Sequence, residues 1–297
     1  MARASVWGVA TLWAAVVLAL GTAASACELA VDAPEAARVE YNPFALGSSS
    51  GPLDIVFGNK GERVCELRLV LVNDVGDPLP LLDLGGVVIE FKPRETSGLF
   101  RRDTEPGAFV LSIPGTSVAR AELDVTVVRN AVVEAGIHQA DLRLSVEAVD
   151  GEALLPPIPL HVILQSAPRA QVNIAGAAGS FASESSVEVV DFGTAATGIT
   201  RQVFVQVRAN TQSTLTVKSQ HRGLLHHVEM GDRGTVIAYT VVLDGRPVDL
   251  AEAWSYRVDP PRTLAGVSLP MDLTLGAVTG QMSGRYEDLI TIDIAPD

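Results

Sequence analysis

Near its C-terminal end the chain reads GRYEDLITIDI over residues 284–294, and this stretch decides the fold class. Its isoleucines at 290, 292 and 294 fall at every second position, which is the period of a strand with one buried face. Gly284 precedes the alternation as a turn residue. The stretch therefore predicts a β-strand over residues 289–294.

Segments of the same kind occur along most of the chain. They alternate or are rich in β-branched residues at 67–72, 123–128, 142–146, 203–207, 215–217, 236–243 and 271–275. Clusters of Gly, Pro, Asn and Asp separate them at intervals of about 8–15 residues, a spacing typical of antiparallel sandwiches. The helical signal is weak. The sequence predicts an all-β protein.

The two halves of the chain resemble each other. GIHQADLRLSV at 136–146 matches GRYEDLITIDI at 284–294, since each has Gly, one further residue, a ring side chain and then an alternating strand. Matching landmarks are Tyr41, Asn59 and Gly136 in the first half and Asp191, Asn210 and Gly284 in the second. Their spacings are 18 and 77 residues against 19 and 74. We therefore expect two tandem immunoglobulin-like β-sandwiches, at residues 27–167 and 168–297.

The N-terminal segment, residues 1–26, is typical of a secretory signal peptide. Arg3 supplies the positive start, residues 6–20 are apolar, and Ala24-Ser25-Ala26 fits an A-x-A cleavage site. The apolar run is shorter than the roughly 20 residues that a spanning helix needs. We expect cleavage before Cys27, export to the periplasm, and no transmembrane segment in the mature chain.

The only two cysteines are Cys27 and Cys65. In an oxidising compartment they are expected to form one disulfide. An alternative stays open, because Ala24-Ser25-Ala26-Cys27 is also a degenerate lipobox. Acylation of Cys27 would make the protein a lipoprotein and leave Cys65 unpaired.

The composition argues against several functions. Without the segment 1–26 the chain has 21 basic and 35 acidic residues, a formal charge of −14, so nucleic acid is not an expected partner. Zinc-type cysteine pairs, a P-loop and HExxH are absent. The G-x-S-x-G match at 47–51 is interpreted as a loop, since a strand-like run follows it and not a helix. We expect no enzyme activity, no cofactor and no metal.

His221, His226 and His227 lie close together in the sequence. Imidazole is a zinc ligand. Adjacent strand residues face opposite sides, however, so His226 and His227 are poorly placed to share one ion. The favoured interpretation is a solvated loop.

With these features in hand, the chain resembles the secreted pilin-like subunits of the chaperone–usher pathway, particularly the spore coat protein U-like branch. In the first half the resemblance rests on Cys27, Tyr41-x-Pro43-Phe44 and Asn59-x-Gly61-x-x-x-Cys65. In the second half it rests on Asp191-Phe192-Gly193, residues 222–226, residues 239–245 and Gly284-x-Tyr286-x-Asp288-x-Ile290-x-Ile292. The chain departs from the pattern in two places: the second half lacks cysteine, and His138 replaces the closing Tyr of the first.

The resemblance implies a sandwich that lacks one strand and exposes an apolar groove and an unpaired edge. The expected groove border is Leu289, Ile290, Ile292 and Ile294. A periplasmic chaperone would lend a strand, and a neighbouring pilin subunit would replace it at the usher by donor-strand complementation. Since the N-terminal residues offer little free donor segment, the expected role is a tip or minor subunit of a surface fimbria. A host or surface receptor for the first domain is a further expectation.

Two other functions are compatible with parts of the sequence. A self-sufficient periplasmic β-sandwich binding protein would show the same final strand. An assembly chaperone is also two sandwiches, but such proteins are usually basic, which the charge of −14 disfavours.

Overall fold

A computed structural model describes residues 27–95, 98–181 and 187–297. Its regular elements are β-strands apart from one 3-10 turn, Gly231–Arg233. The predicted all-β class is confirmed. Among the described residues, no helix is long and apolar enough to cross a bilayer. The signal peptide expected at residues 1–26 lies outside the described residues.

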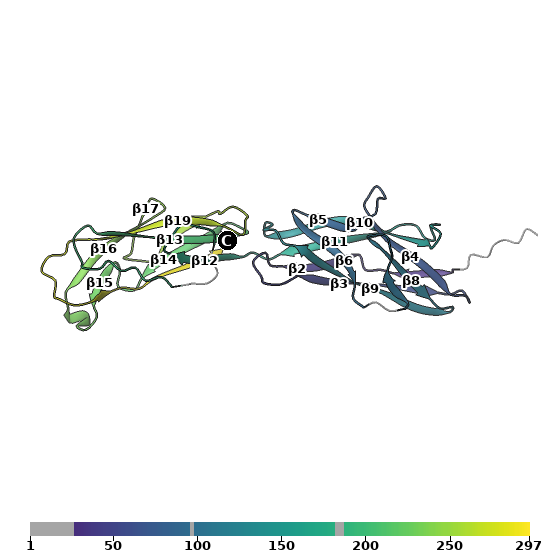
Figure 1. Ribbon diagram of the computed structural model, residues 1–297, viewed down its shortest axis with the longest axis horizontal. Coiled ribbons are helices and arrows are strands. Elements are labelled where there is room, and N and C mark those ends of the chain that lie inside the picture. Colours follow the sequence, from purple (N-terminus) through teal and green to yellow (C-terminus); the bar gives the residue numbers. More distant parts are fainter. Residues whose placement is uncertain (1–26, 96–97, 182–186) are drawn as a thin grey trace, which may run out of the picture.

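The strands form two lobes that lie end to end (Figure 1). We call residues 27–166 lobe 1 and residues 170–297 lobe 2. The strands of lobe 1 are β1 (Leu29–Asp32), β2 (Ala36–Tyr41), β3 (Ser50–Asn59), β4 (Cys65–Val72), β5 (Leu81–Leu84), β6 (Val87–Pro93), β7 (Phe100–Arg102), β8 (Ala108–Ile113), β9 (Ser117–Arg129), β10 (Gly136–Ala148) and β11 (Ile158–Ser166). The strands of lobe 2 are β12 (Ala170–Ala175), β13 (Thr200–Ala209), β14 (Ser213–Ser219), β15 (Leu224–His227), β16 (Val236–Leu243), β17 (Arg246–Val248), β18 (Trp254–Val258), β19 (Val267–Leu275), β20 (Tyr286–Glu287) and β21 (Ile290–Pro296).

Lobe 1 is a sandwich of two sheets, ordered β1-β3-β9-β6-β5 and β2-β11-β10-β4-β8-β7. Alternate residues of the strands face inward and are buried, as Leu53, Ile55 and Phe57 of β3 show. Pairing is antiparallel except between β2 and β11, which run parallel with Val39 beside Leu164. The sequence predicted antiparallel sheets, so this pair is an exception. Parallel strands need a long connection, and here most of the lobe lies between β2 and β11 along the chain.

Lobe 2 repeats much of this arrangement. Its larger sheet follows β12-β13-β19-β16-β15-β20, and its smaller sheet is β18-β14-β21. The central order β3-β9-β6 of lobe 1 recurs as β13-β19-β16, and the pair β4-β10 recurs as β14-β21. Each lobe has its own buried apolar cluster. The second sheet of lobe 2 is shorter, because no described strand of lobe 2 occupies the place of β2, β11 or β7.

The lobes are joined by a short, hydrogen-bonded connection between Ser166 and Ala170. The fully buried Asn210 donates from its Nδ2 to Ala167 O (2.9 Å) and accepts at its Oδ1 from Arg169 N (2.7 Å). The main-chain carbonyl oxygen of Asn210 accepts from Ala135 N of lobe 1 (2.9 Å). The domain boundary expected at residues 167 and 168 lies in this connection, and remains a prediction about independent folding.

Candidate functional site

The most distinctive feature of lobe 2 is the outer edge of β21. This strand pairs antiparallel with β14, from Ser219 beside Ile290 to Ser213 beside Pro296. Its counterpart β10 pairs on both edges, with β4 and with β11. Within the described part of the chain no strand pairs with the second edge of β21. An unpaired edge of this kind is a template for another strand.

A groove of about 1150 Å³ runs beside this edge. One bank is the end of the chain from Gly284 to Ile292, and the other is the irregular segment 187–195. Aliphatic side chains of the larger sheet form its floor, among them Val203, Ile237, Met271 and Leu273. The groove therefore opens into the core of lobe 2.

Both banks of the groove carry exposed aliphatic side chains. Val187 is 73% exposed, Val189 is 80% exposed and Leu289 is 59% exposed. Large aliphatic side chains gathered along one groove are typical of a binding surface, whereas single exposed ones are common on any protein. The groove is thus suited to an apolar segment.

The structure places three of the four expected border residues in the groove lining. These are Leu289, Ile290 and Ile292. Ile294 packs on the core of lobe 2 but does not line the groove. Leu289 precedes β21, while the three isoleucines lie within it and are only half-buried. That these residues border a donor-strand groove remains a proposal.

The buried carboxylate of Asp288 ties this edge to the rest of lobe 2. Its side chain is 1% exposed. Oδ2 accepts from Ser219 Oγ (2.6 Å) and from the hydroxyl of Tyr239 (2.5 Å). Oδ1 accepts from the backbone N–H groups of His221 (3.0 Å) and Leu289 (2.8 Å). Burial, and next the hydrogen bond to Asp288, raise the pKa of the Tyr239 hydroxyl, so it remains a donor at all ordinary pH values.

The Gly-x-Tyr part of the motif is explained by His227. A side chain at Gly284 would collide with the ring of His227, and Gly284 also has a φ of +152°. Tyr286 packs edge-on against the same ring, with the centroids 5.1 Å apart. Gly, Tyr and Asp therefore act together to position the start of β21.

The solvated-loop interpretation of the histidines is wrong for His227. It lies on β15 and is 3% exposed. His226 also lies on β15, and its ring stacks on that of His221 with the centroids 4.2 Å apart. Among the described residues no group of three His, Cys, Asp or Glu side chains could hold a metal ion.

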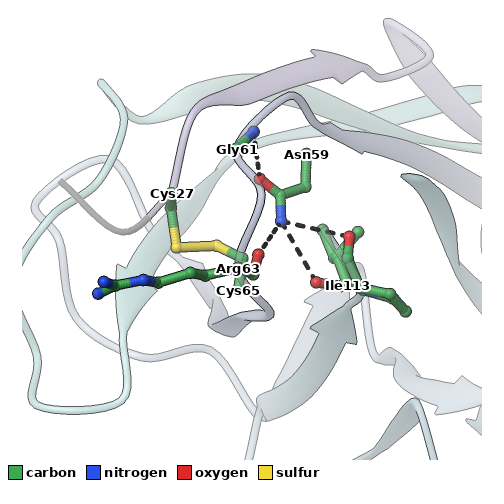
Figure 2. The surroundings of a disulfide bond; sticks show 7 residues. Cys27, Asn59, Gly61, Arg63, Cys65 and Ile113 are labelled. Atoms are coloured by element: carbon green, nitrogen blue, oxygen red, sulfur yellow. Dashed lines mark hydrogen bonds between the residues drawn. A yellow bond between two sulfur atoms is a disulfide. The ribbon is translucent and has the colours of Figure 1, made fainter. Parts of the chain in front are cut away.

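The start of lobe 1 is fixed by the predicted disulfide between Cys27 and Cys65, whose Cα atoms are 5.4 Å apart. Figure 2 shows the buried Asn59 beside it, which donates to Arg63 O (2.7 Å) and accepts from Gly61 N (3.0 Å). The next strands, β1 and β2, pair with β3 and β11 of the same lobe. The described N-terminal segment is therefore used inside lobe 1.

The segment 187–195 was not identified as part of a site from the sequence. Asp191 Oδ1 accepts from Gly193 N (2.8 Å) and makes a local turn. Arg201 donates to the carbonyl oxygens of Asp191 (3.1 Å) and Phe192 (3.3 Å). Val190 and Phe192 pack on the core of lobe 2. These contacts hold the segment along the bank opposite β21.

Comparisons with known proteins give only distant likenesses. No family model and no curated protein matches the sequence. A solved chaperone–tip adhesion subunit pre-assembly complex from archaic chaperone–usher Csu pili of Acinetobacter baumannii is similar, with 11% identity, TM-score 0.42, and coverage of 89% of this chain and 99% of that chain. A tip adhesin from Pseudomonas aeruginosa is 13% identical, with TM-score 0.33 and coverage of 90% and 94%. An enterotoxigenic E. coli CFA/I adhesin is 12% identical, with TM-score 0.38 and coverage of 89% and 93%. Likenesses at these identities and TM-scores do not establish a function for this chain.

Proposed function

We propose that the protein is a structural or adhesive subunit of a chaperone–usher-type surface fimbria and that lobe 2 accepts a strand from another polypeptide. One observation carries the proposal: β10 of lobe 1 is covered by β11, and its counterpart β21 has no such partner among the described residues. The groove beside β21 leads into the lobe 2 core. A donated strand would complete the sheet and cover that core at once.

Lobe 1 indicates the direction of the donated strand. β11 runs antiparallel to β10 and parallel to β2. Segment 187–191 follows β12 and precedes β13, just as β2 follows β1 and precedes β3. A strand between β21 and residues 187–191 would therefore run antiparallel to β21.

The described residues from Cys27 to Tyr41 support a tip or minor position. A donor subunit needs a free extended segment, and here β1 and β2 pair within lobe 1 while Cys27 is held by Cys65. A disulfide and a thioether-linked lipid exclude each other at one sulfur, so the disulfide also argues against the lipoprotein alternative. In this proposal the partners are a periplasmic chaperone, an usher and one neighbouring pilin subunit. The chain would pass through the periplasm to the cell surface, with lobe 1 facing outward toward any receptor.

The test is to give lobe 2 its own copy of the missing strand. In lobe 1, residues 149–157 connect β10 to β11. Appending a copy of residues 149–166 after Pro296 would place the β11 sequence beside β21. Burial of its inward side chains should raise the melting temperature of lobe 2 by roughly 10 °C or more.

The matched control carries the same extension with Leu160, Val162 and Leu164 of the copied segment replaced by Ser. It should leave the melting temperature near that of the unextended chain. If the apolar extension stabilises lobe 2 no more than the Ser version does, lobe 2 is a complete sandwich and the proposal is wrong.

A further inference from the structure

The two lobes can be compared residue by residue at the edge where the strand is missing. The Gly136–Gly284 correspondence places Asp141 of lobe 1 at the position of Leu289. The correspondence of the two buried residues Asn59 and Asn210 places Ala36 at the position of Val187. It also matches the core residues Val39 and Tyr41 with Val190 and Phe192, which pack on the core of lobe 2, so the sequence landmark Asp191 lies one residue before the true counterpart of Tyr41. Inward positions agree under the same offsets, since Leu144 matches Ile292 and both pack on the core of their lobe.

In lobe 1 these two positions flank one residue of β11. The sheet register sets His161 beside Asp141 on one side and beside Ala36 on the other. His161 Nδ1 lies 2.7 Å from Asp141 Oδ1, and Gln139 Nε2 donates to the same carboxylate at 3.0 Å. The outer face of the completed sheet is therefore polar at this point.

In lobe 2 the corresponding pair is apolar. Leu289 and Val187 line the same groove from opposite banks, and more than half of each side chain is exposed. Val189, two residues further along the same bank, is exposed as well. A polar residue between Leu289 and Val187 would find no hydrogen-bonding side chain on either of them.

We propose, on the basis of the function proposed above, that the strand filling lobe 2 carries an apolar residue on its outer face where β11 carries His161. The residues immediately before and after it in the partner strand point inward, and they are apolar because they cover the core of lobe 2. The partner is therefore an extended segment of another polypeptide with three consecutive apolar residues centred on the position that His161 has in β11. A strictly alternating apolar–polar strand is the poorer ligand.

The reason is the area that one side chain can cover. A Val or Leu between Leu289 and Val187 removes apolar surface from water on three side chains at once, whereas a Lys or His must bring its polar end across the same patch. The additional apolar area that Val or Leu buries should strengthen binding of the partner strand about tenfold relative to His or Lys.

The test uses peptides with the β11 sequence, IPLXVILQS, in which X is Val, His or Lys. Binding to the purified protein is measured by fluorescence anisotropy with labelled peptides. The Val peptide should bind about ten times more tightly than the His peptide, and the Lys peptide should not bind better than the His peptide.

A substitution in the protein should reverse this preference. Leu289→Asp gives lobe 2 the acidic side chain that lobe 1 has at the matching position, Asp141. The His and Lys peptides should then bind at least as well as the Val peptide. The matched control is Val75→Asp, which adds the same charge at a 76% exposed turn of lobe 1 and should leave the order of the three peptides unchanged.

The outcomes separate the two proposals. If all three peptides bind with equal affinity, lobe 2 accepts a strand but the apolar outer face is wrong. If none binds or stabilises the protein, the strand-accepting function fails, and the inference with it. If Leu289→Asp leaves the preference for Val unchanged, Leu289 does not select the partner.

Discussion

The strands β10 and β21 occupy matching places in the two lobes but differ in how well they are covered. Leu142, Leu144 and Val146 of β10 are no more than 2% exposed. The matching Ile290, Ile292 and Ile294 of β21 are only half-buried. The inward side chains are equally apolar, so the difference comes from the second edge of each strand: β10 pairs there with β11, and β21 pairs there with no described strand. In the function proposed here, lobe 1 completes its own core and lobe 2 leaves part of its core for a partner strand to complete.

The comparison predicts its largest effect at one matched pair of positions. Leu144→Ala removes a side chain that is 1% exposed and should cost about 4 kcal/mol in the free energy of unfolding of lobe 1. Ile292→Ala removes a half-buried side chain beside an open groove and should cost about 1–2 kcal/mol. Urea unfolding combined with peptide-resolved hydrogen exchange would assign each loss to its lobe. Equal losses would mean that β21 is as well covered as β10.

The disulfide gives the next largest effect, and only in lobe 1. Cys27 and Cys65 are 38 residues apart, so replacing both by Ala should destabilise lobe 1 by about 3–4 kcal/mol in the chain-entropy model. Unfolding in urea with and without reductant is the measurement: reductant should lower the stability of the native protein but not of the double variant. A matching loss of protection in β21 would show that the two lobes unfold together.

The fold class and the disulfide could be predicted from the sequence because both rest on local patterns. Alternation reports which face of a strand is buried, and two cysteines leave one pairing. The open edge could not be read in this way. GIHQADLRLSV and GRYEDLITIDI alternate alike, although one strand has two neighbours and the other has one. Alternation describes faces, whereas edge pairing uses backbone groups that every sequence has.

The histidines show a second limit of sequence reasoning. His227 is polar and lies near other polar residues, which favoured a solvated loop. It is buried because Gly284 leaves room for its ring and Tyr286 packs against it, and both come from a segment more than fifty residues later. The bank at residues 187–195 was missed for a related reason, since it has no regular secondary structure in the chain that the structure describes.

The buried carboxylate predicts an effect of intermediate size that only lobe 2 can show. Asp288 corresponds to Ala140 in lobe 1, so β10 is held without any such group. Tyr239→Phe removes one hydrogen bond to the carboxylate and should cost about 1.5–3 kcal/mol in the unfolding of lobe 2. The matched control is Tyr256→Phe, since that hydroxyl is not among the donors to Asp288 and its loss should change stability little. Hydrogen exchange at β21 should rise only in the first variant.

The smallest effect concerns Asp141 and His161, the polar pair that β10 and β11 have and that the edge of β21 lacks. Hydrogen bonds from Gln139, and next from His161, hold the pKa of Asp141 below its ordinary value. Because this pKa is lowered on folding, the stabilisation is present above the ordinary carboxyl range and is lost as pH falls through the folded pKa. Gln139→Ala and His161→Ala should each raise the pKa of Asp141 measured by NMR, with the larger rise for Gln139. Lobe 1 stability should hardly change at neutral pH, since the carboxylate is largely exposed and screened by solvent. A large loss of stability in His161→Ala would mean that polar pairing across the outer face matters to the edge itself. In that case the apolar pair Leu289 and Val187 would weaken the binding of every partner strand to lobe 2. Our proposal instead expects this pair to favour partner strands with an apolar residue at that position.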